Sequence, residues 1–165
     1  MPLFLRSLTA FRLGPVLATA VWAILLAGCQ GPPVTVTVPH VERFTVDDPT
    51  ATSLTIDRAL SERAEAFARS RKYAQTWRGS GLSMEPLIPP DAWIVTETIP
   101  YDALETGQVV LYNRSPGRRV AHALVKKTWE GWITVGVNNQ RIADHTRVTR
   151  HNYLGVVTAA FIAQP

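Results

Sequence analysis

The sequence predicts a mostly β fold, in which a compact β domain is preceded by one helix and an extended tether. From Trp77 onward, short runs rich in Val, Ile and Tyr are separated by Pro, Gly, Asn and Asp, which is typical of successive antiparallel strands. A single helical pattern precedes these runs, and 46% hydrophobic with 18% charged residues is a globular composition. We therefore expect four segments, at residues 1–28, 29–54, 55–76 and 77–165.

Residues 1–28 have the pattern of a secretory signal peptide or an N-terminal anchor. Arg6 and Arg12 are followed by a mostly apolar run from Leu13 to Leu26, and the segment holds no acidic residue. The run is shorter than the roughly 20 residues that a transmembrane helix needs. Either interpretation places the rest of the chain outside the cytoplasm, tethered to a membrane.

The charge balance gives little support to nucleic-acid binding. The formal net charge is +4, but without Arg6 and Arg12 fifteen basic residues face thirteen acidic ones, a net charge of +2. The single cysteine excludes an intramolecular disulfide and a Cys-rich zinc site. His145 and His151 are six residues apart, which is no standard zinc spacing, so we expect neither a metal nor another cofactor.

Residues 29–54 are expected to form the tether. The stretch from Val34 to Val38 alternates Val with Thr and is compatible with one short strand, but the prolines of the segment favour an extended linker. Such a linker reaches some tens of ångströms from a bilayer.

The segment at residues 55–76 is expected to contain a helix from Asp57 to Ala74, with Thr55 or Asp57 as its N-terminal cap. Apolar residues recur there at helical spacing, with no interrupting Gly or Pro: Ala59, Leu60, Ala64, Phe67 and Ala68. The basic residues of this helix indicate a solvated face, with attraction to anionic lipid headgroups as the alternative.

The β region is expected to contain five strands, at residues 92–98, 108–112, 120–128, 132–137 and 153–162. The stretch from Arg114 to Arg119 contains Pro116-Gly117 and is expected to form a hairpin tip. Ahead of the first strand, Gly79-Ser80-Gly81-Leu82-Ser83-Met84-Glu85-Pro86-Leu87 presents a serine on a Gly-rich turn.

This turn contains Gly-x-Ser-Met-x-Pro, which resembles the nucleophile box of signal peptidase I and related serine peptidases. Further boxes follow in that family's order: Pro90 to Val95, Gly107 to Tyr112, Val120 to Val125, Gly136 to Asn139 with Asp144, and Leu154 to Val157. The resemblance covers about residues 77–160 and implies a signal-peptidase/LexA-like β domain. It assigns the nucleophile to Ser83 and substrate contacts to Gly81, Met84 and Pro86.

The chain departs from the family at several positions. Gln108 and Val137 stand where the family has Asp, and Pro90 stands where it has Gly. Such positions usually support turns, so their loss threatens stability or geometry more than chemistry. At the base position most bacterial members have Lys, whereas one branch has His, usually followed by Arg; here His122 is followed by Ala123.

A serine hydroxyl needs a neighbouring base to become a nucleophile. His122 and Lys126 are the candidates, and four residues of strand separate them by about 13 Å, so only one can contact Ser83. We favour His122, because neutral imidazole is a base near pH 6.5 whereas Lys must be buried to act. The resemblance gives Asp144 the role of orienting the base; the alternatives are a core histidine and a loop aspartate.

The Ser83 N–H is expected to form half of an oxyanion hole. The second donor stays open between a backbone N–H and Ser80, because Gly81 lacks the hydroxyl that some relatives have there.

The apolar N-terminal run ends in Leu26-Ala27-Gly28-Cys29, which resembles the lipobox of bacterial lipoproteins. That resemblance implies cleavage before Cys29, attachment of diacylglycerol and palmitate-type acyl chains, and, with Gln30 next, sorting toward the outer membrane. The alternative is an uncleaved anchor in which Cys29 is incidental.

Together these features predict a serine endopeptidase of signal peptidase type, tethered to the cell membrane or outer membrane on its extracytoplasmic side. Exported proteins or peptides would be its substrates. The alternative is a catalytically inert lipoprotein that uses the same fold as a binding or structural module. A Ser83 Oγ to His122 nitrogen distance near about 3 Å favours the enzyme, and one beyond about 6 Å favours the inert module. A third hypothesis is a self-cleaving repressor of the same fold superfamily. The export signal makes it the weakest of the three.

Overall fold

The computed structural model describes residues 16–24, 34–45, 50–139 and 142–164. These residues form one α-helix, a short 3-10 helix and eight strands, which confirms the mostly β class with a helix before the main β region. The elements are β1 (Val16–Ile24), β2 (Val34–Thr45), α1 (Ser53–Arg69), β3 (Ala74–Arg78), β4 (Trp93–Glu97), the 3-10 helix η1 (Tyr101–Ala103), β5 (Val109–Ser115), β6 (Arg118–Thr128), β7 (Gly131–Val135) and β8 (Tyr153–Gln164).

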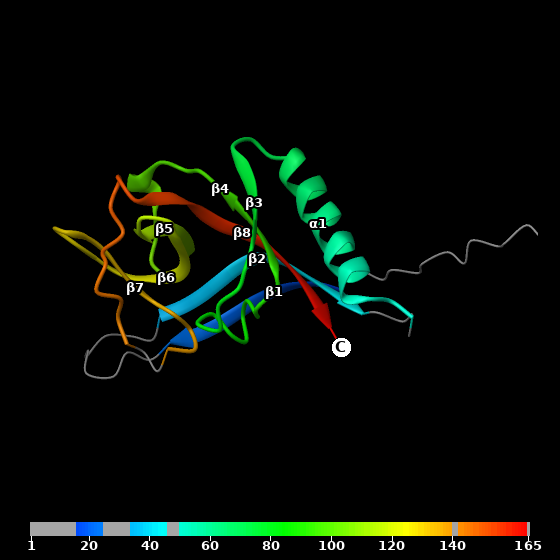
Figure 1. The fold of residues 1–165 in the computed structure, drawn as a ribbon. Coiled ribbons are helices and arrows are strands. Elements are labelled where there is room, and N and C mark those ends of the chain that lie inside the picture. The colour runs from blue at the N-terminus through cyan, green and yellow to red at the C-terminus, as the bar shows by residue number, and fades with distance from the viewer. Residues whose placement is uncertain (1–15, 25–33, 46–49, 140–141, 165) are drawn as a thin grey trace, which may run out of the picture.

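The strands belong to one sheet whose main path runs β1-β2-β8-β5-β6-β7, and β4 joins β3 to β8 off that path (Figure 1). The long strand β8 pairs with three neighbours: antiparallel with β4 and β5, and parallel with β2. All five strands expected in the β region are present, with ends that differ by no more than three residues. The hairpin at Pro116-Gly117 is also confirmed, since Ser115 pairs with Arg118 across it.

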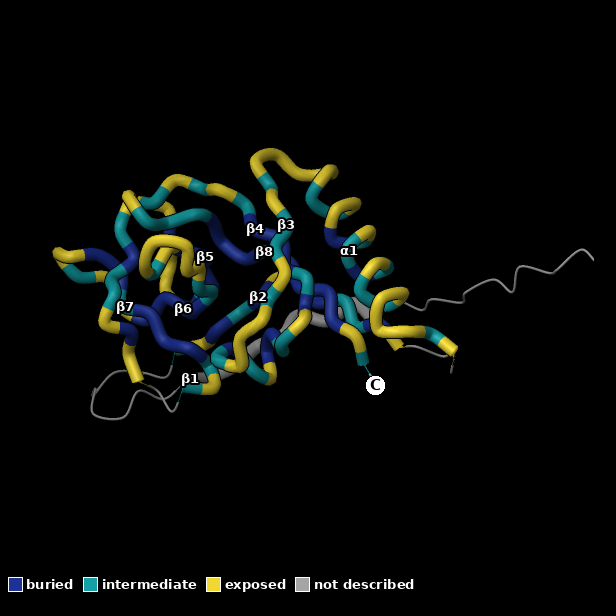
Figure 2. The backbone as a smooth tube through the Cα atoms, in the orientation of Figure 1, coloured by how far each residue is buried: buried dark blue, intermediate teal, exposed yellow. Residues whose placement is uncertain are grey.

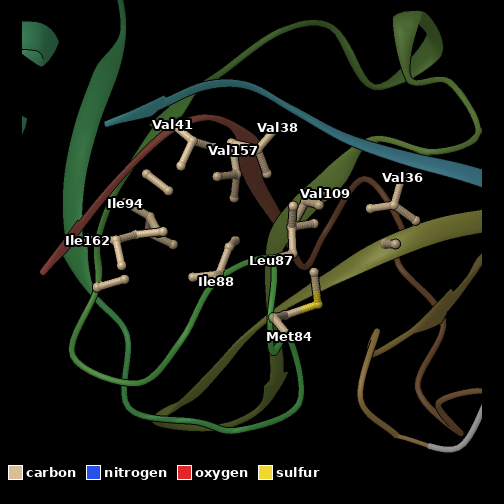
Figure 3. Packing of buried hydrophobic residues seen from close by; sticks show 13 residues of the cluster. Val36, Val38, Val41, Met84, Leu87, Ile88, Ile94, Val109, Val157 and Ile162 are labelled. Atoms are coloured by element: carbon tan, nitrogen blue, oxygen red, sulfur yellow. The ribbon is translucent and has the colours of Figure 1, made fainter. Parts of the chain in front are cut away.

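The core lies between the strands of this curved sheet. Figure 2 shows that the buried stretches follow β4, β5 and β8, whereas the outward side of α1 is exposed. The largest buried cluster combines side chains of β2, β4, β5 and β8 with the turn that follows β3 (Figure 3). A second cluster lies around Tyr112 and Trp132, and a third joins α1 to the sheet through Leu60 and Ala64.

The expected tether is wrong for residues 34–45, which form β2. Val36, Val38 and Val41 are 1% exposed or less, so the alternation of Val and Thr reflects a strand with one buried face. Pro39 is tolerated because it is exposed and lies where the β1–β2 pairing is interrupted between Val38 and Val41. A proline at a bulge leaves no ladder hydrogen bond unmade.

The helix begins and ends earlier than expected. Its N-cap is Thr52, whose Oγ1 accepts a hydrogen bond from the Thr55 N–H at 3.3 Å, rather than Thr55 or Asp57. It ends at Arg69, and a positive φ of 60° at Tyr73 precedes β3, a strand that the sequence did not predict. The basic side chains of α1 make ion pairs with Glu42, Glu62 and Glu65, in keeping with a solvated face.

The N-terminal segment is described only in part. Residues 16–24 of the apolar run pair antiparallel with β2 as β1, and residues 1–15 and 25–33, which include Cys29, lie outside the described residues. In the ranges that the structure describes, no helix is both long and apolar enough to cross a membrane.

The turn before β5 offers a test of how β2 packs. Gly107 has a φ of +92°, and a Cβ there would lie 2.1 Å from the Thr35 carbonyl oxygen of β2. We expect Gly107→Ala to lower the free energy of unfolding by at least about 3 kcal/mol, because backbone strain adds to a collision with backbone. Urea denaturation measures this loss.

The matched control is Gly117→Ala, at a φ of +74° with nothing within 4 Å of the added Cβ. It should cost only the left-handed conformation, about 1 kcal/mol. Equal losses for the two variants would mean that β2 does not pack against the turn at Gly107.

Candidate active site

Ser83, His122 and Asp144 meet in the structure, although they lie in three separate parts of the chain. The His122 Nε2 lies 2.9 Å from the Ser83 Oγ, and the opposite ring nitrogen, Nδ1, is hydrogen-bonded to the Asp144 Oδ2. His122 is 2% exposed and Asp144 is 6% exposed, whereas Ser83 is partly exposed. The arrangement is a continuous line of hydrogen bonds from a solvent-accessible hydroxyl to a buried carboxylate.

The turn that carries Ser83 is fixed by the core on one side. Met84, Leu87 and Ile88 are buried in the main cluster, where Figure 3 shows them directed toward Val109 and Val157. Because these three buried side chains closely follow Ser83 in the chain, they restrict the movement of the backbone that carries the serine.

A second loop fixes the same turn from the other side. The Asn138 N–H donates to the Ser83 carbonyl oxygen at 2.8 Å, and the Asn138 side-chain amide donates to the Leu82 carbonyl oxygen at 3.1 Å. A Cβ on Gly136 would lie 2.8 Å from the Ser83 carbonyl oxygen, so glycine permits this close approach. The Gly136 to Asn139 box therefore positions the nucleophile turn.

His122 is selected over Lys126 by the shape of β6. His122 lies opposite Val110 of β5 and is buried, whereas Lys126 is exposed. The expected alternation along the strand is broken between Leu124 and Lys126, where the pairing with β7 shifts register. Among the described residues, His122 is thus the base candidate that reaches Ser83.

Asp144 is held by more donors than the sequence indicated. Its Oδ2 accepts hydrogen bonds from the Tyr112 hydroxyl at 3.0 Å and from the Thr134 hydroxyl at 2.9 Å, in addition to His122. Its backbone N–H donates to the Thr134 carbonyl oxygen at 2.9 Å. Tyr112 and Thr134 are fully buried polar residues of β5 and β7. Tyr112 is the last residue of the Gly107 to Tyr112 box and Thr134 belongs to no box. Neither was expected at the site, because the only sequence signal of each is a hydroxyl within an apolar run.

These contacts keep the carboxylate ionised. Burial alone would raise the pKa of Asp144, but hydrogen bonds and charge from His122, with the hydroxyls of Thr134 and Tyr112, hold the pKa below its ordinary value. Burial also raises the pKa of Tyr112, so this phenol stays a hydrogen-bond donor. Because an ionised carboxylate only accepts, a His122 ring that carries a single N–H donates it from Nδ1 and leaves Nε2 free to accept the Ser83 proton.

Ser83 and His122 lie on the wall of a cavity of about 630 Å³. One side of the cavity is formed by Trp77 to Met84, and another by Gly117 to His122 of the β5–β6 hairpin. A volume of this size accommodates several residues of a peptide. Gly81 and Met84 line it, as expected for substrate contacts. Pro86 does not: it is exposed outside the cavity, and the same turn contributes Ile88 and Pro89 to the wall instead.

The same turn contains the candidate hydrogen-bond donors for an oxyanion hole. Ser80 and Gly81 both line the cavity beside Ser83, and a Cβ on Gly81 would lie 3.9 Å from the Ser83 Oγ. Ser80 is exposed and close in sequence to the nucleophile, so it stays a candidate for the second donor together with the backbone N–H groups of the turn.

Within the described residues, no group of three or more His, Cys, Asp or Glu is arranged to hold a metal ion. Comparison with known proteins gives no assignment, because no family model, curated protein or solved structure matches the chain.

Asp144→Asn tests the orienting role of the carboxylate. An amide is neutral and can present N–H groups to its neighbours, so it disfavours the tautomer in which Nε2 faces Ser83 unprotonated. We expect the rate at which a fluorophosphonate phosphonylates the Ser83 hydroxyl, with release of fluoride, to fall at least about 10²-fold, which is roughly 2.7 kcal/mol. An unchanged rate in the folded variant would reduce the site to a Ser83–His122 dyad.

The same variant is also predicted to differ from the wild type in how its stability changes at acid pH. Because the folded pKa of Asp144 lies below its ordinary value of 3.8, the carboxylate stabilises the fold at pH above that value, and this contribution is lost as pH falls through the folded pKa. The difference in unfolding free energy between the wild type and Asp144→Asn should therefore shrink below about pH 4. A difference that grows on acidification would contradict the assignment.

The base is tested with His122→Ala and Lys126→Ala. The first should abolish phosphonylation of the Ser83 hydroxyl by the same fluorophosphonate, because His122 contacts that hydroxyl. The second should leave most of it, because Lys126 is exposed and does not line the cavity. The opposite ranking of the two variants would identify a Ser–Lys site.

Proposed function

We propose that this chain is a membrane-tethered serine endopeptidase of signal peptidase type, which processes exported precursor proteins. The observation that carries the proposal is the hydrogen-bonded line Ser83–His122–Asp144 on the wall of the cavity. The ordered sequence boxes that resemble signal peptidase I lend it further support.

The proposed chemistry has two halves. In the first, the Ser83 Oγ attacks the scissile carbonyl carbon while its proton moves to the His122 Nε2, and the Ser83 N–H stabilises the resulting oxyanion. The C–N bond then breaks as His122 returns the proton to the leaving amine. In the second half, water activated by His122 attacks the acyl-enzyme, and the serine is regenerated.

One observation favours the enzyme over the inert module: the Ser83 Oγ lies 2.9 Å from the His122 Nε2, a distance suited to a nucleophile–base pair. The replaced turn residue Gln108 keeps a turn contact, because its Oε1 accepts a hydrogen bond from the Glu105 N–H at 3.0 Å. The loss of Asp at that position has therefore not removed the support of the turn.

The proposal is tested with the full-length chain purified in detergent. A fluorescent fluorophosphonate should label the wild type, and the labelled peptide identified by mass spectrometry should contain Ser83. Ser83→Ala should lose both this label and cleavage of internally quenched peptides with alanine at the first and third positions before the cut, while Lys126→Ala serves as the matched control. Cleavage that survives in Ser83→Ala would refute the proposal.

The membrane attachment forms part of the proposal and rests on the Leu26 to Cys29 lipobox resemblance. Cleavage before Cys29 would remove β1, which among the described strands pairs only with β2, so β2 would become an edge strand of the mature protein. Metabolic labelling with a palmitate analogue should tag the wild-type chain, and Cys29→Ala should abolish the tag. Labelling that persists in the variant would refute lipidation at Cys29, and a mature protein that retains Met1 would indicate an uncleaved anchor instead.

A further inference from the structure

The cavity that contains the catalytic residues is also strongly basic. Its lining includes four arginines, Arg78, Arg114, Arg118 and Arg119, which we call the arginine groove. None of the described residues that line the cavity is Asp or Glu. A cleft lined by one sign of charge concentrates the field and attracts ligands of the opposite charge.

Two of the four arginines have carboxylate partners outside the lining. Arg78 lies 3.3 Å from Asp57 and 3.1 Å from Asp91, and Arg114 lies 3.9 Å from the Asp144 Oδ1. Their charges are partly compensated within the protein, so they contribute less to binding an external anion.

Arg118 and Arg119 have no such compensation. Within the described residues neither makes an ion pair, although both are exposed and adjacent on β6. Most other arginines of the described chain do have a carboxylate within 4 Å, including Arg58, Arg63, Arg69, Arg71, Arg147 and Arg150. Of the three described arginines without an ion pair, Arg43, Arg118 and Arg119, two thus line the cavity beside Ser83.

Arg119 is also held in place. Its guanidinium lies 4.8 Å from the centre of the Trp77 ring, and Trp77 belongs to the opposite wall of the cavity. Stacking on an aromatic face leaves the N–H donors at the edge of the guanidinium free for a planar acceptor. A carboxylate matches this donor geometry through two parallel hydrogen bonds.

We propose that the arginine groove selects substrates with an acidic side chain close to the scissile bond, whose carboxylate is bound by Arg118 and Arg119. This inference rests on the proposed peptidase function and adds a substrate class to it. An acidic peptide is favoured over an anionic membrane surface because both arginines line the same cavity as Ser83, where a bound substrate must lie.

The test uses the full-length chain and pairs of internally quenched peptides. The two peptides of a pair differ only by Asp or Asn at one position, and the pairs together sample positions on both sides of the cut. Active sites are first counted with a neutral fluorophosphonate. At one or more positions we expect kcat/KM to be about tenfold higher for the Asp peptide. This preference should shrink when salt is raised from about 50 mM to about 500 mM, because the pairs are exposed.

Arg118→Gln with Arg119→Gln should bring the Asp-to-Asn ratio close to 1. Arg58→Gln with Arg69→Gln is the control, since it removes the same two charges from the exposed face of α1, outside the cavity. An active enzyme that cleaves Asp and Asn peptides equally at every position overturns this inference and leaves the proposed function intact. A chain inert to both probe and peptides overturns both.

Sedimentation with vesicles of phosphatidylglycerol distinguishes the lipid alternative. Vesicle binding that is lost in the double variant, with no Asp preference in peptide cleavage, would assign the arginines to the membrane and overturn the peptide inference.

Discussion

An ionised carboxylate is costly to bury unless donors surround it, and the site of this protein is built around the one that Asp144 provides. The donors that reach its Oδ2 come from three adjacent strands: Tyr112 from β5, His122 from β6 and Thr134 from β7. The strand order β5-β6-β7 thus creates the site as well as the sheet. A shift of any one strand would leave the carboxylate short of a donor and turn the base away from the serine.

Ser83, the proposed nucleophile, depends on a different kind of constraint. Ser83 lies on an irregular turn, so no helix or strand hydrogen bonds fix its position. Buried side chains at Met84 and Leu87 hold the turn against the core, and Asn138 holds its carbonyl groups. The base is therefore placed by sheet register and the nucleophile by packing, and the two meet at hydrogen-bond distance only because both constraints are satisfied.

The sequence predicted best those features that depend on residues close together in the chain, such as apolar runs and short motifs. The strands β4 to β8 follow from apolar runs between turn residues, and the three catalytic candidates follow from boxes of fixed order. β2 was missed because Pro39 indicates a break, whereas the structure places it at a bulge. Tyr112 and Thr134 were missed because nothing in a sequence tells which buried hydroxyl faces a distant carboxylate. The pairing of strands far apart in the chain determines that contact.

The early start of β2 changes the geometry of attachment to a membrane. A lipid on Cys29 would be separated from Val34, the first residue of β2, by residues 30–33 alone. The five residue steps from Cys29 to Val34 span at most about 18 Å in extended chain, so the first residue of β2 would lie close to the headgroups. The catalytic domain would then be confined to a thin layer above the bilayer. In that layer it would encounter polypeptides that are themselves still attached to the membrane far more often than proteins diffusing freely beyond it.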